Sequence, residues 1–165
     1  MKLSHKIAPC LWFANEAEEA ARFYTGIFPD SKIVKIARYG KAGFETHRQP
    51  AGTVLTVQFE LAGQPFTALN GGPLFKFSEA ISLQIYVDEQ KELDFYWDKL
   101  TAGGDPKSQV CGWLKDRYGL SWQVVPAKFV DWFGEPNEKT ERLMTALLQM
   151  GKLDIAALER AYQGR

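Results

Sequence analysis

A strand, a helix and further strands follow one another twice along the chain, and this repeat constrains the fold more than any other feature. The first copy begins with an apolar run at residues 7–13, and the second with an alternating run at residues 81–87. A residue that commonly caps helices follows each run, Asn15 in the first copy and Asp88 in the second. The repeat predicts two βαβββ modules in tandem and therefore an α+β fold.

The register between the two copies follows from placing Asn15 on Asp88. This alignment also places Leu11 on Gln84, so that the first strands of the two copies share a phase. It superposes two pairs of neighbouring aromatic residues, Phe23 with Tyr24 and Tyr96 with Trp97. Agreement between capping residues, strand phase and aromatic pairs indicates a true internal repeat.

The repeat and the chain length predict a single domain that spans all 165 residues. Its first module covers residues 5–72 and its second covers residues 79–126. Residues 127–165 form a helical tail, with one helix near residues 137–150 and a shorter one capped by Asp154. The apolar face of the longer helix predicts that the tail covers a sheet or a partner subunit.

Composition excludes several classes of partner. The 20 basic residues balance the 20 acidic ones, so no overall field attracts nucleic acid or an anionic membrane. No apolar segment has the length of a signal-peptide core or a membrane span. The two cysteines, Cys10 and Cys111, lie far apart and have no metal-binding spacing. A chain of this size does not need disulfides, so we expect reduced thiols in a cytoplasmic protein.

Residues 111–126 predict a β-hairpin with a tight turn at residues 116–119 and a second strand that ends at Pro126. Side chains alternate along a strand, so Gln123 and Trp122 point to opposite faces. This hairpin resembles the C-terminal signature of the PhnB-like branch of the vicinal-oxygen-chelate superfamily, which has the glyoxalase/bleomycin-resistance fold. Some members of this branch carry the label 3-demethylubiquinone-9 3-methyltransferase.

The resemblance covers roughly the first 130 residues. It implies that the modules form a curled mixed sheet with outer helices and a ligand on the concave side, and that the protein is a homodimer. It also implies, for typical superfamily enzymes, a divalent metal held by His, Glu or Gln. The corresponding positions here hold Gln84, Gln123, Asn70 and Leu11, or Cys10 beside Leu11. Neutral amides are poor ligands for transition metals, so we expect neither a metal nor a cofactor.

The predicted ligand site is built on the fifth strand, where apolar residues alternate with Ser82, Gln84 and Tyr86. The apolar set should meet the helices, which leaves the polar set facing the concavity. The expected small-molecule ligand contacts six residues: Gln84, Gln123, Asn70, Ser82, Tyr86 and Trp113.

Other candidate residues have a functional and an ordinary interpretation. Cys111 is either a nucleophile or a small residue packed at a strand start, and packing is favoured because no neighbour in the hairpin activates it. His5 and His47 lack partner ligands at metal spacing, and we interpret both as surface residues. Three phenylalanines either line an apolar part of the pocket or pack in a core: Phe66, Phe75 and Phe77.

Two functions fit this pattern. The first is a metal-independent enzyme of unknown substrate, and the alternative is a non-catalytic protein that sequesters a ligand, as resistance proteins of this fold do. A methyltransferase that binds S-adenosylmethionine on a doubly wound sheet needs a glycine-rich turn between a strand and a helix. The pair Gly71–Gly72 precedes a proline, and the pair Gly103–Gly104 follows a helix. We therefore do not expect the activity that the label names.

Overall fold

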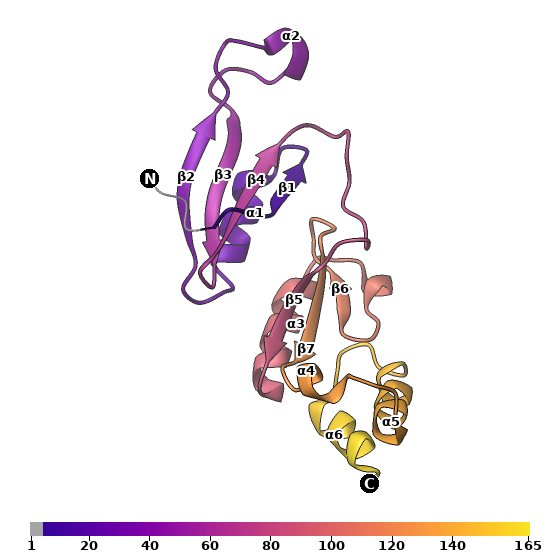
Figure 1. Cartoon of the computed structure of the whole chain (residues 1–165). Helices are drawn as coiled ribbons and strands as arrows, with labels where there is room; N and C mark the ends of the chain where they lie inside the picture. Colours follow the sequence, from indigo (N-terminus) through magenta and orange to yellow (C-terminus); the bar gives the residue numbers. More distant parts are fainter. Residues whose placement is uncertain (1–4) are drawn as a thin grey trace. The chain divides into compact units, whose positions relative to one another are not determined.

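The computed structural model describes residues 5–165, and the chain divides into two compact units. The first ends at Lys76 and the second spans Phe77–Arg165. Each unit holds one mixed sheet with a helix on one of its faces (Figure 1). Together with the helices at the C-terminus, these sheets confirm the α+β fold class. The assignment of both units to a single domain stays a prediction.

From residue 5 onward, the first unit contains four strands and two helices. They are β1 (Cys10–Phe13), α1 (Ala17–Thr25), β2 (Lys32–Arg38), α2 (Phe44–His47), β3 (Val54–Leu61) and β4 (Gln64–Asn70). The strand order is β1-β4-β3-β2. β1 pairs in parallel with β4, and the other neighbours are antiparallel.

Helix α1 packs closely on the first sheet because small residues recur on one side of it at helical spacing. Ala17, Ala20 and Ala21 are fully buried, and their small size lets the helix approach the strands. One turn further on, Tyr24 stacks on Phe59 of β3 with the ring centroids 6.4 Å apart. This face of the sheet forms the core of the first unit.

The second unit repeats the strand–helix–strand order with fewer strands. Its sheet region consists of β5 (Leu83–Val87), α3 (Gln90–Thr101), the 3₁₀ helix η1 (Pro106–Ser108), β6 (Trp113–Lys115) and β7 (Ser121–Pro126). The strand order is β5-β7-β6, in which β5 is parallel to β7 and β6 is antiparallel to it. Leu93, Trp97 and Leu100 of α3 are buried and form the core of this unit.

The second module is therefore one strand short of the βαβββ pattern. Between α3 and β6 the chain forms η1 and a single antiparallel bridge that joins Val110 to Trp113. The Asp105 side chain accepts a hydrogen bond from the Lys107 backbone N–H at 2.9 Å, and Pro106 lies between them. This arrangement starts a turn where the repeat predicts a strand. The tandem order holds, but the second copy is βαββ.

The tail contains α4 (Phe129–Trp132), α5 (Glu138–Leu147) and α6 (Ile155–Gln163). The predicted start of α5 is confirmed, because Asn137 forms a capping box with Thr140. The predicted cap of the last helix is also confirmed: Asp154 accepts a hydrogen bond from the Ala157 N–H at 2.9 Å. None of the helices between residues 5 and 165 combines the length and the apolar character of a membrane span.

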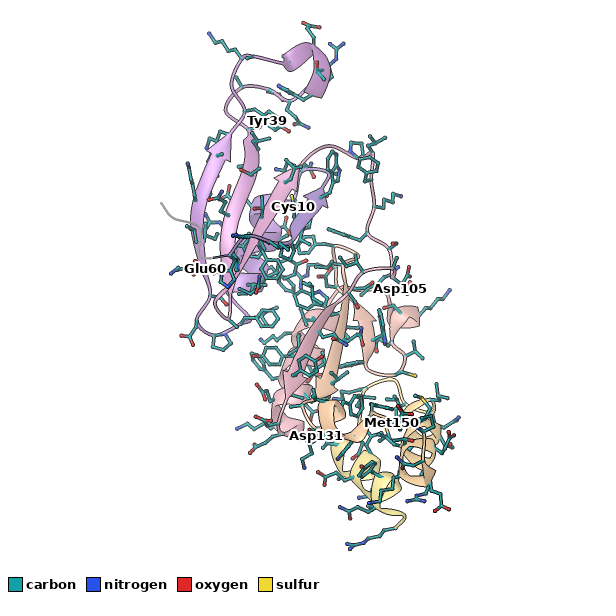
Figure 2. All side chains as sticks on the ribbon, in the orientation of Figure 1. Cys10, Tyr39, Glu60, Asp105, Asp131 and Met150 are labelled. Atoms are coloured by element: carbon teal, nitrogen blue, oxygen red, sulfur yellow. The ribbon has the colours of Figure 1, made fainter. Side chains whose placement is uncertain are left out.

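The tail is tied to the sheet region of its own unit at two places. The Gln90 side chain of α3 donates to the Leu153 carbonyl at 3.0 Å and accepts from the Ile155 N–H at 2.8 Å. The Cys111 N–H donates to the carbonyl of Met150, which Figure 2 shows in the loop after α5, at 2.7 Å. The tail is therefore anchored to α3 and to the segment before β6 within its own unit.

The cap predicted at Asn15 is wrong. Helix α1 begins at Ala17, and neither Asn15 nor Glu16 caps it with a side chain. Instead, Asn70 at the end of β4 accepts a hydrogen bond from the Ala17 N–H at 2.8 Å. The parallel pairing of β1 with β4 places Asn70 beside Phe13, where its amide reaches the start of the helix. The cap comes from a residue far away in sequence, which a local pattern does not reveal.

The cap predicted at Asp88 is also wrong, and so is one part of the register between the copies. Asp88 donates its backbone N–H to the Glu92 side chain at 3.2 Å, and α3 begins only at Gln90. The helices align as predicted, but the strands are shifted by one residue: Leu11 is buried against its helix, whereas Gln84 is exposed. The counterpart of Gln84 in the first unit is therefore the exposed neighbour of Leu11.

Candidate functional site

The face of the second sheet opposite α3 carries most of the residues predicted for the site. Along β5, Ile85 and Val87 are buried, whereas Gln84 and Tyr86 are exposed. This alternation confirms the predicted strand phase. On β7, Gln123 lies directly beside Gln84 in the parallel register, so both amides belong to the same face.

Four of these polar side chains form one hydrogen-bond network. The Gln84 Nε2 donates to the Gln123 Oε1 at 3.3 Å, and the Gln123 Nε2 donates to the Ser82 Oγ at 2.8 Å. The Tyr86 hydroxyl donates to the Gln84 Oε1 at 2.9 Å. These bonds hold both amides in place and leave lone pairs and N–H groups free to contact a ligand.

A cavity of about 420 Å³ lies over this network, between the open face of the sheet and the helical tail. The sheet supplies its polar part through Gln84, Tyr86 and Gln123. The tail supplies an apolar wall from α4, α5 and the residues beside them: Phe129, Val130, Phe133, Met144, Leu147 and Leu148. A few polar groups opposite an apolar wall are typical of small-molecule sites.

Trp113 and Cys111 form the side of the cavity next to β6. Trp113 is half-buried and lies beside Gln123 in the antiparallel register. Cys111 also lines the cavity, and its φ of 53° lies in the left-handed region, which is strained for a residue with a side chain. The structure thus brings Ser82, Gln84, Tyr86, Gln123 and Trp113 together.

Asn70, the sixth predicted residue, lies in the first unit and has a different environment. Its side chain is 6% exposed, and its Oδ1 caps α1. Its Nδ2 donates to the Val54 carbonyl at 3.0 Å, so both ends of the amide bond to the backbone. Asn70 thus belongs to the scaffold of the first unit, and we leave it out of the site.

The predicted hairpin of the second unit is confirmed, and a buried carboxylate organises its turn. Asp116 is 2% exposed, and its Oδ1 accepts the backbone N–H groups of Tyr118 and Leu120 at 2.8 and 3.1 Å. Its Oδ2 accepts the indole N–H of Trp122 at 2.8 Å. These bonds position β6 and β7, and with them Trp113 and Gln123.

The residues with two interpretations are mostly structural. Phe66 is buried and stacks on Phe59 in the core of the first unit. Phe75 is exposed and contacts the ring of Trp12 edge-on, and Phe77 is half-buried in the second unit. His5 is exposed, and the half-buried His47 accepts a hydrogen bond from the Gln49 N–H at 3.0 Å.

Sequence reasoning missed the apolar wall that the tail provides. The pattern of α5 indicated a covered face, but it did not show that Met144 and Leu147 would lie over the amides. The two residues between β7 and α4 turn the chain back over the sheet, and no residue type marks that direction. The available signal was the cluster of aromatic residues after Pro126, which includes Phe129 and Phe133.

The residues at the superfamily's metal positions do not fit a transition metal. The positions that the resemblance implies hold Gln84, Gln123 and Asn70, and the corrected strand register puts Cys10 in the place of Leu11. Amides are weak ligands for such ions. Cys10 is exposed overall, but partial burial of its thiol raises the pKa, which disfavours the thiolate that would bind a metal ion. Among residues 5–165, no group of three His, Cys, Asp or Glu side chains is arranged around a metal position.

Comparison with known proteins gives consistent results. The chain is similar to a putative 3-demethylubiquinone-9 3-methyltransferase, PhnB protein, from Bacillus cereus, with 36% identity over 73% of this chain and 99% of that one, and a TM-score of 0.62. Protein PA1353 from Pseudomonas aeruginosa shares the fold, with 20% identity over 74% and 98% of the two chains and a TM-score of 0.57.

A glyoxylase/bleomycin resistance protein/dioxygenase domain from Frankia sp. EAN1pec is similar at 18% identity over 76% of this chain and 93% of that one, with a TM-score of 0.46. No curated protein matches the chain. The family model described as 3-demethylubiquinone-9 3-methyltransferase matches residues 5–125, which contain both sheets except the last residue of β7. The chain therefore belongs to this family, and its similarity to the Bacillus cereus PhnB protein agrees with that assignment.

Proposed function

We propose that the protein binds a small amphipathic molecule in the cavity between the second sheet and the helical tail. The observation that carries this proposal is the convergence of Ser82, Gln84, Tyr86 and Gln123 on one network below an apolar wall. Amide and phenol groups bond a neutral polar group of the ligand, and the phenylalanines and leucines of the tail cover its apolar part.

The chemistry of the lining favours binding, with catalysis as the second candidate. Among the described residues that line the cavity, the titratable side chains are Tyr86 and Cys111. A metal-independent enzyme would use one of them as an acid, base or nucleophile. Cys111 lies in the cavity wall and has a strained backbone. Backbone strain is common at active sites, so catalysis stays the second candidate.

Methyl transfer from S-adenosylmethionine is not part of the proposal, because both glycine pairs have a packing role. A Cβ on Gly71 would lie 2.2 Å from the Trp12 ring, and one on Gly104 would lie 2.0 Å from the Lys115 carbonyl oxygen. Neither pair stands between a strand and the helix that follows it. The glycines therefore allow close packing and do not form a nucleotide-binding turn.

Three expectations about the whole protein accompany the proposal. Val130 and Leu148 of the tail are 71% and 59% exposed, and we expect a homodimer that covers such apolar surface. Sedimentation that gives a monomer at micromolar concentration would contradict the dimer. We also expect a cytoplasmic location, because the two cysteines are free thiols, and fractionation of cells tests it. Elemental analysis of the purified protein tests the expectation of no bound metal.

The experiment that tests the ligand site is a thermal-stabilisation screen of small amphipathic molecules, followed by affinity measurements on variants. A ligand of the native state raises the melting temperature. Gln84→Leu and Gln123→Leu should each weaken binding by about 1–3 kcal/mol, because a polar group of the ligand loses its partner. Gln58→Leu is the matched control, since Gln58 is an exposed strand glutamine of the first unit.

The two glutamine variants should unfold at nearly the same temperature as the parent, because neither amide belongs to the core. Reduced stability with unchanged affinity in the folded fraction would contradict the assignment of these residues to the ligand site. Incubation of each stabilising ligand with the protein then separates binding from catalysis. Turnover that is lost in Tyr86→Phe or Cys111→Ala would establish an enzyme, and recovery of unchanged ligand would establish a binder.

A further inference from the structure

A second cavity of about 480 Å³ lies on the β6 side of the same unit, and one of its walls contains a polar atom without a partner. Ser121 lines this cavity and is 1% exposed, yet its Oγ has no hydrogen-bond partner among residues 5–165. A buried hydroxyl costs free energy unless it is paired, so its position indicates a bound group that completes it. The neighbouring Ser82, by contrast, accepts a hydrogen bond from Gln123.

The charges around this cavity indicate what that group is. Lys115 lies beside Ser121 in the antiparallel register, and its side chain is only 24% exposed. Lys107 also lines the cavity, and its ammonium has no carboxylate within ion-pair distance in the described part of the chain. Two ammonium groups and a hydroxyl are suitable donors for an oxyanion.

The structure already contains a carboxylate at this place. The Lys115 ammonium forms an ion pair with Glu79, whose side chain is 67% exposed and belongs to the irregular segment before β5. The hydrogen bond from Lys115 lowers the pKa of the Glu79 carboxyl. An exposed carboxylate on a segment without regular structure is displaced at small cost, because exposed ion pairs contribute little to stability.

We propose that this second cavity is an oxyanion subsite, in which a carboxylate or phosphate group binds Lys115, Lys107 and Ser121 and displaces the carboxylate of Glu79. Trp113 and Cys111 line both this cavity and the amide-lined ligand site. One molecule with an anionic end can therefore extend from the amide network to the lysines. This extension rests on the proposed function, whereas the oxyanion subsite itself does not.

The test is a titration of the ¹⁵N-labelled full-length protein with inorganic phosphate and, separately, with acetate, followed by amide chemical shifts. Saturable shifts should appear at Ser108, Lys115 and Ser121. The arm with the tighter apparent constant identifies the preferred oxyanion. Absence of saturable shifts at these amides in both arms overturns the proposal.

Variants separate the subsite from unspecific binding of anions. Ser121→Ala should weaken binding about tenfold, and it should fold, because it removes only an unpaired hydroxyl. Lys115→Gln should also weaken binding about tenfold, and Lys128→Gln is the matched control, because Lys128 is an exposed lysine paired with Glu159. Equal affinities in the parent, Ser121→Ala and Lys115→Gln overturn the proposal.

Glu79→Gln has the opposite expected effect and therefore tests the displacement directly. Removing the competing carboxylate should strengthen anion binding roughly twofold to fivefold. Unchanged or weaker binding in Glu79→Gln overturns the role of Glu79 as the displaced group. Gln84→Leu should leave the anion titration unchanged, so failure of the oxyanion subsite is distinguished from failure of the amide-lined ligand site.

Discussion

In each unit the first strand pairs in parallel with the last, but the open faces of the two sheets have different chemistry. In the second unit, Gln84 lies beside Gln123, and both join a polar network. At the equivalent positions of the first unit, Cys10 lies beside Thr67 (Figure 2 shows Cys10 on β1). A pair of amides thus corresponds to a thiol and a hydroxyl, so the proposed ligand chemistry belongs to one copy of the repeat.

The comparison shows which side of a repeated module is free to diverge. The faces that meet α1 and α3 are apolar in both units, because burial of those faces stabilises each unit. The opposite faces do not carry that constraint. The second unit also has the tail, which lies beyond the residues matched by the family model and closes a cavity over its open face.

The units differ equally in the polar residue that organises each of them. Asn70 ends β4 and caps α1, whereas the equivalent position at the end of β7 is Pro126, which has no donor or acceptor in its side chain. In the second unit, a buried carboxylate inside the hairpin takes the organising role. Two predictions use this difference, and a third concerns the attachment of the tail within the second unit.

The largest effect is expected from Asp116→Ala. The change leaves two backbone N–H groups and the Trp122 indole N–H buried without an acceptor, so unfolding should become easier by about 3 kcal/mol or more. Urea unfolding measures the loss, and hydrogen exchange should show it in the second unit, with the amides of β3 and β4 keeping their protection. A loss below about 1 kcal/mol would show that Asp116 does not organise the hairpin.

Asn70→Ala should have the next largest effect, located in the other unit. It removes the cap of α1 and the donor to Val54, at a cost of about 1–2 kcal/mol. Asn70→Asp is the control, because it keeps the acceptor for the Ala17 N–H and should recover part of the stability. Ligand affinity should not change in either variant. A selective loss of affinity in Asn70→Ala would return Asn70 to the site.

The smallest effect concerns the attachment of the tail. Hydrogen bonds from Lys152 and Gln90 lower the pKa of Asp94 from its usual 3.8, and Asp98 also lies near Lys152. A lowered pKa in the folded state means that this contribution is present above pH 3.8 and is lost as the pH falls through the folded value. Because the pair is exposed, the loss should be less than about 1 kcal/mol.

The measurement compares denaturant unfolding at neutral pH and below pH 3.8 in the parent and in Lys152→Met. The part of the pH dependence due to Asp94 should shrink in the variant, because the Lys152 partner is gone. Identical pH profiles of the two proteins would show that the Asp94–Lys152 pair does not stabilise the tail.

Most elements of the fold and the core of the site are predictable from residue patterns. The alternation of β5 indicated which side chains leave the core, and it led to Gln84 and Tyr86. The start of α5 near Asn137 and the cap of α6 at Asp154 were predictable, because both side chains bond to backbone groups only a few residues away. The failed caps of α1 and α3 show the limit of the same reasoning, since a suitable residue before a helix does not guarantee the bond.

By itself, the sequence determined the repeat, the strand phase and the hairpin, because these depend on spacings of a few residues and on the alternation of side chains. The tertiary structure decided the role of Asn70 and the placement of the tail over the amides. It also left the Ser121 hydroxyl without a hydrogen-bond partner among the described residues. These features join residues far apart in the chain. They are set by which strands pair and how helices pack on them, since such contacts depend on the closure of the whole unit.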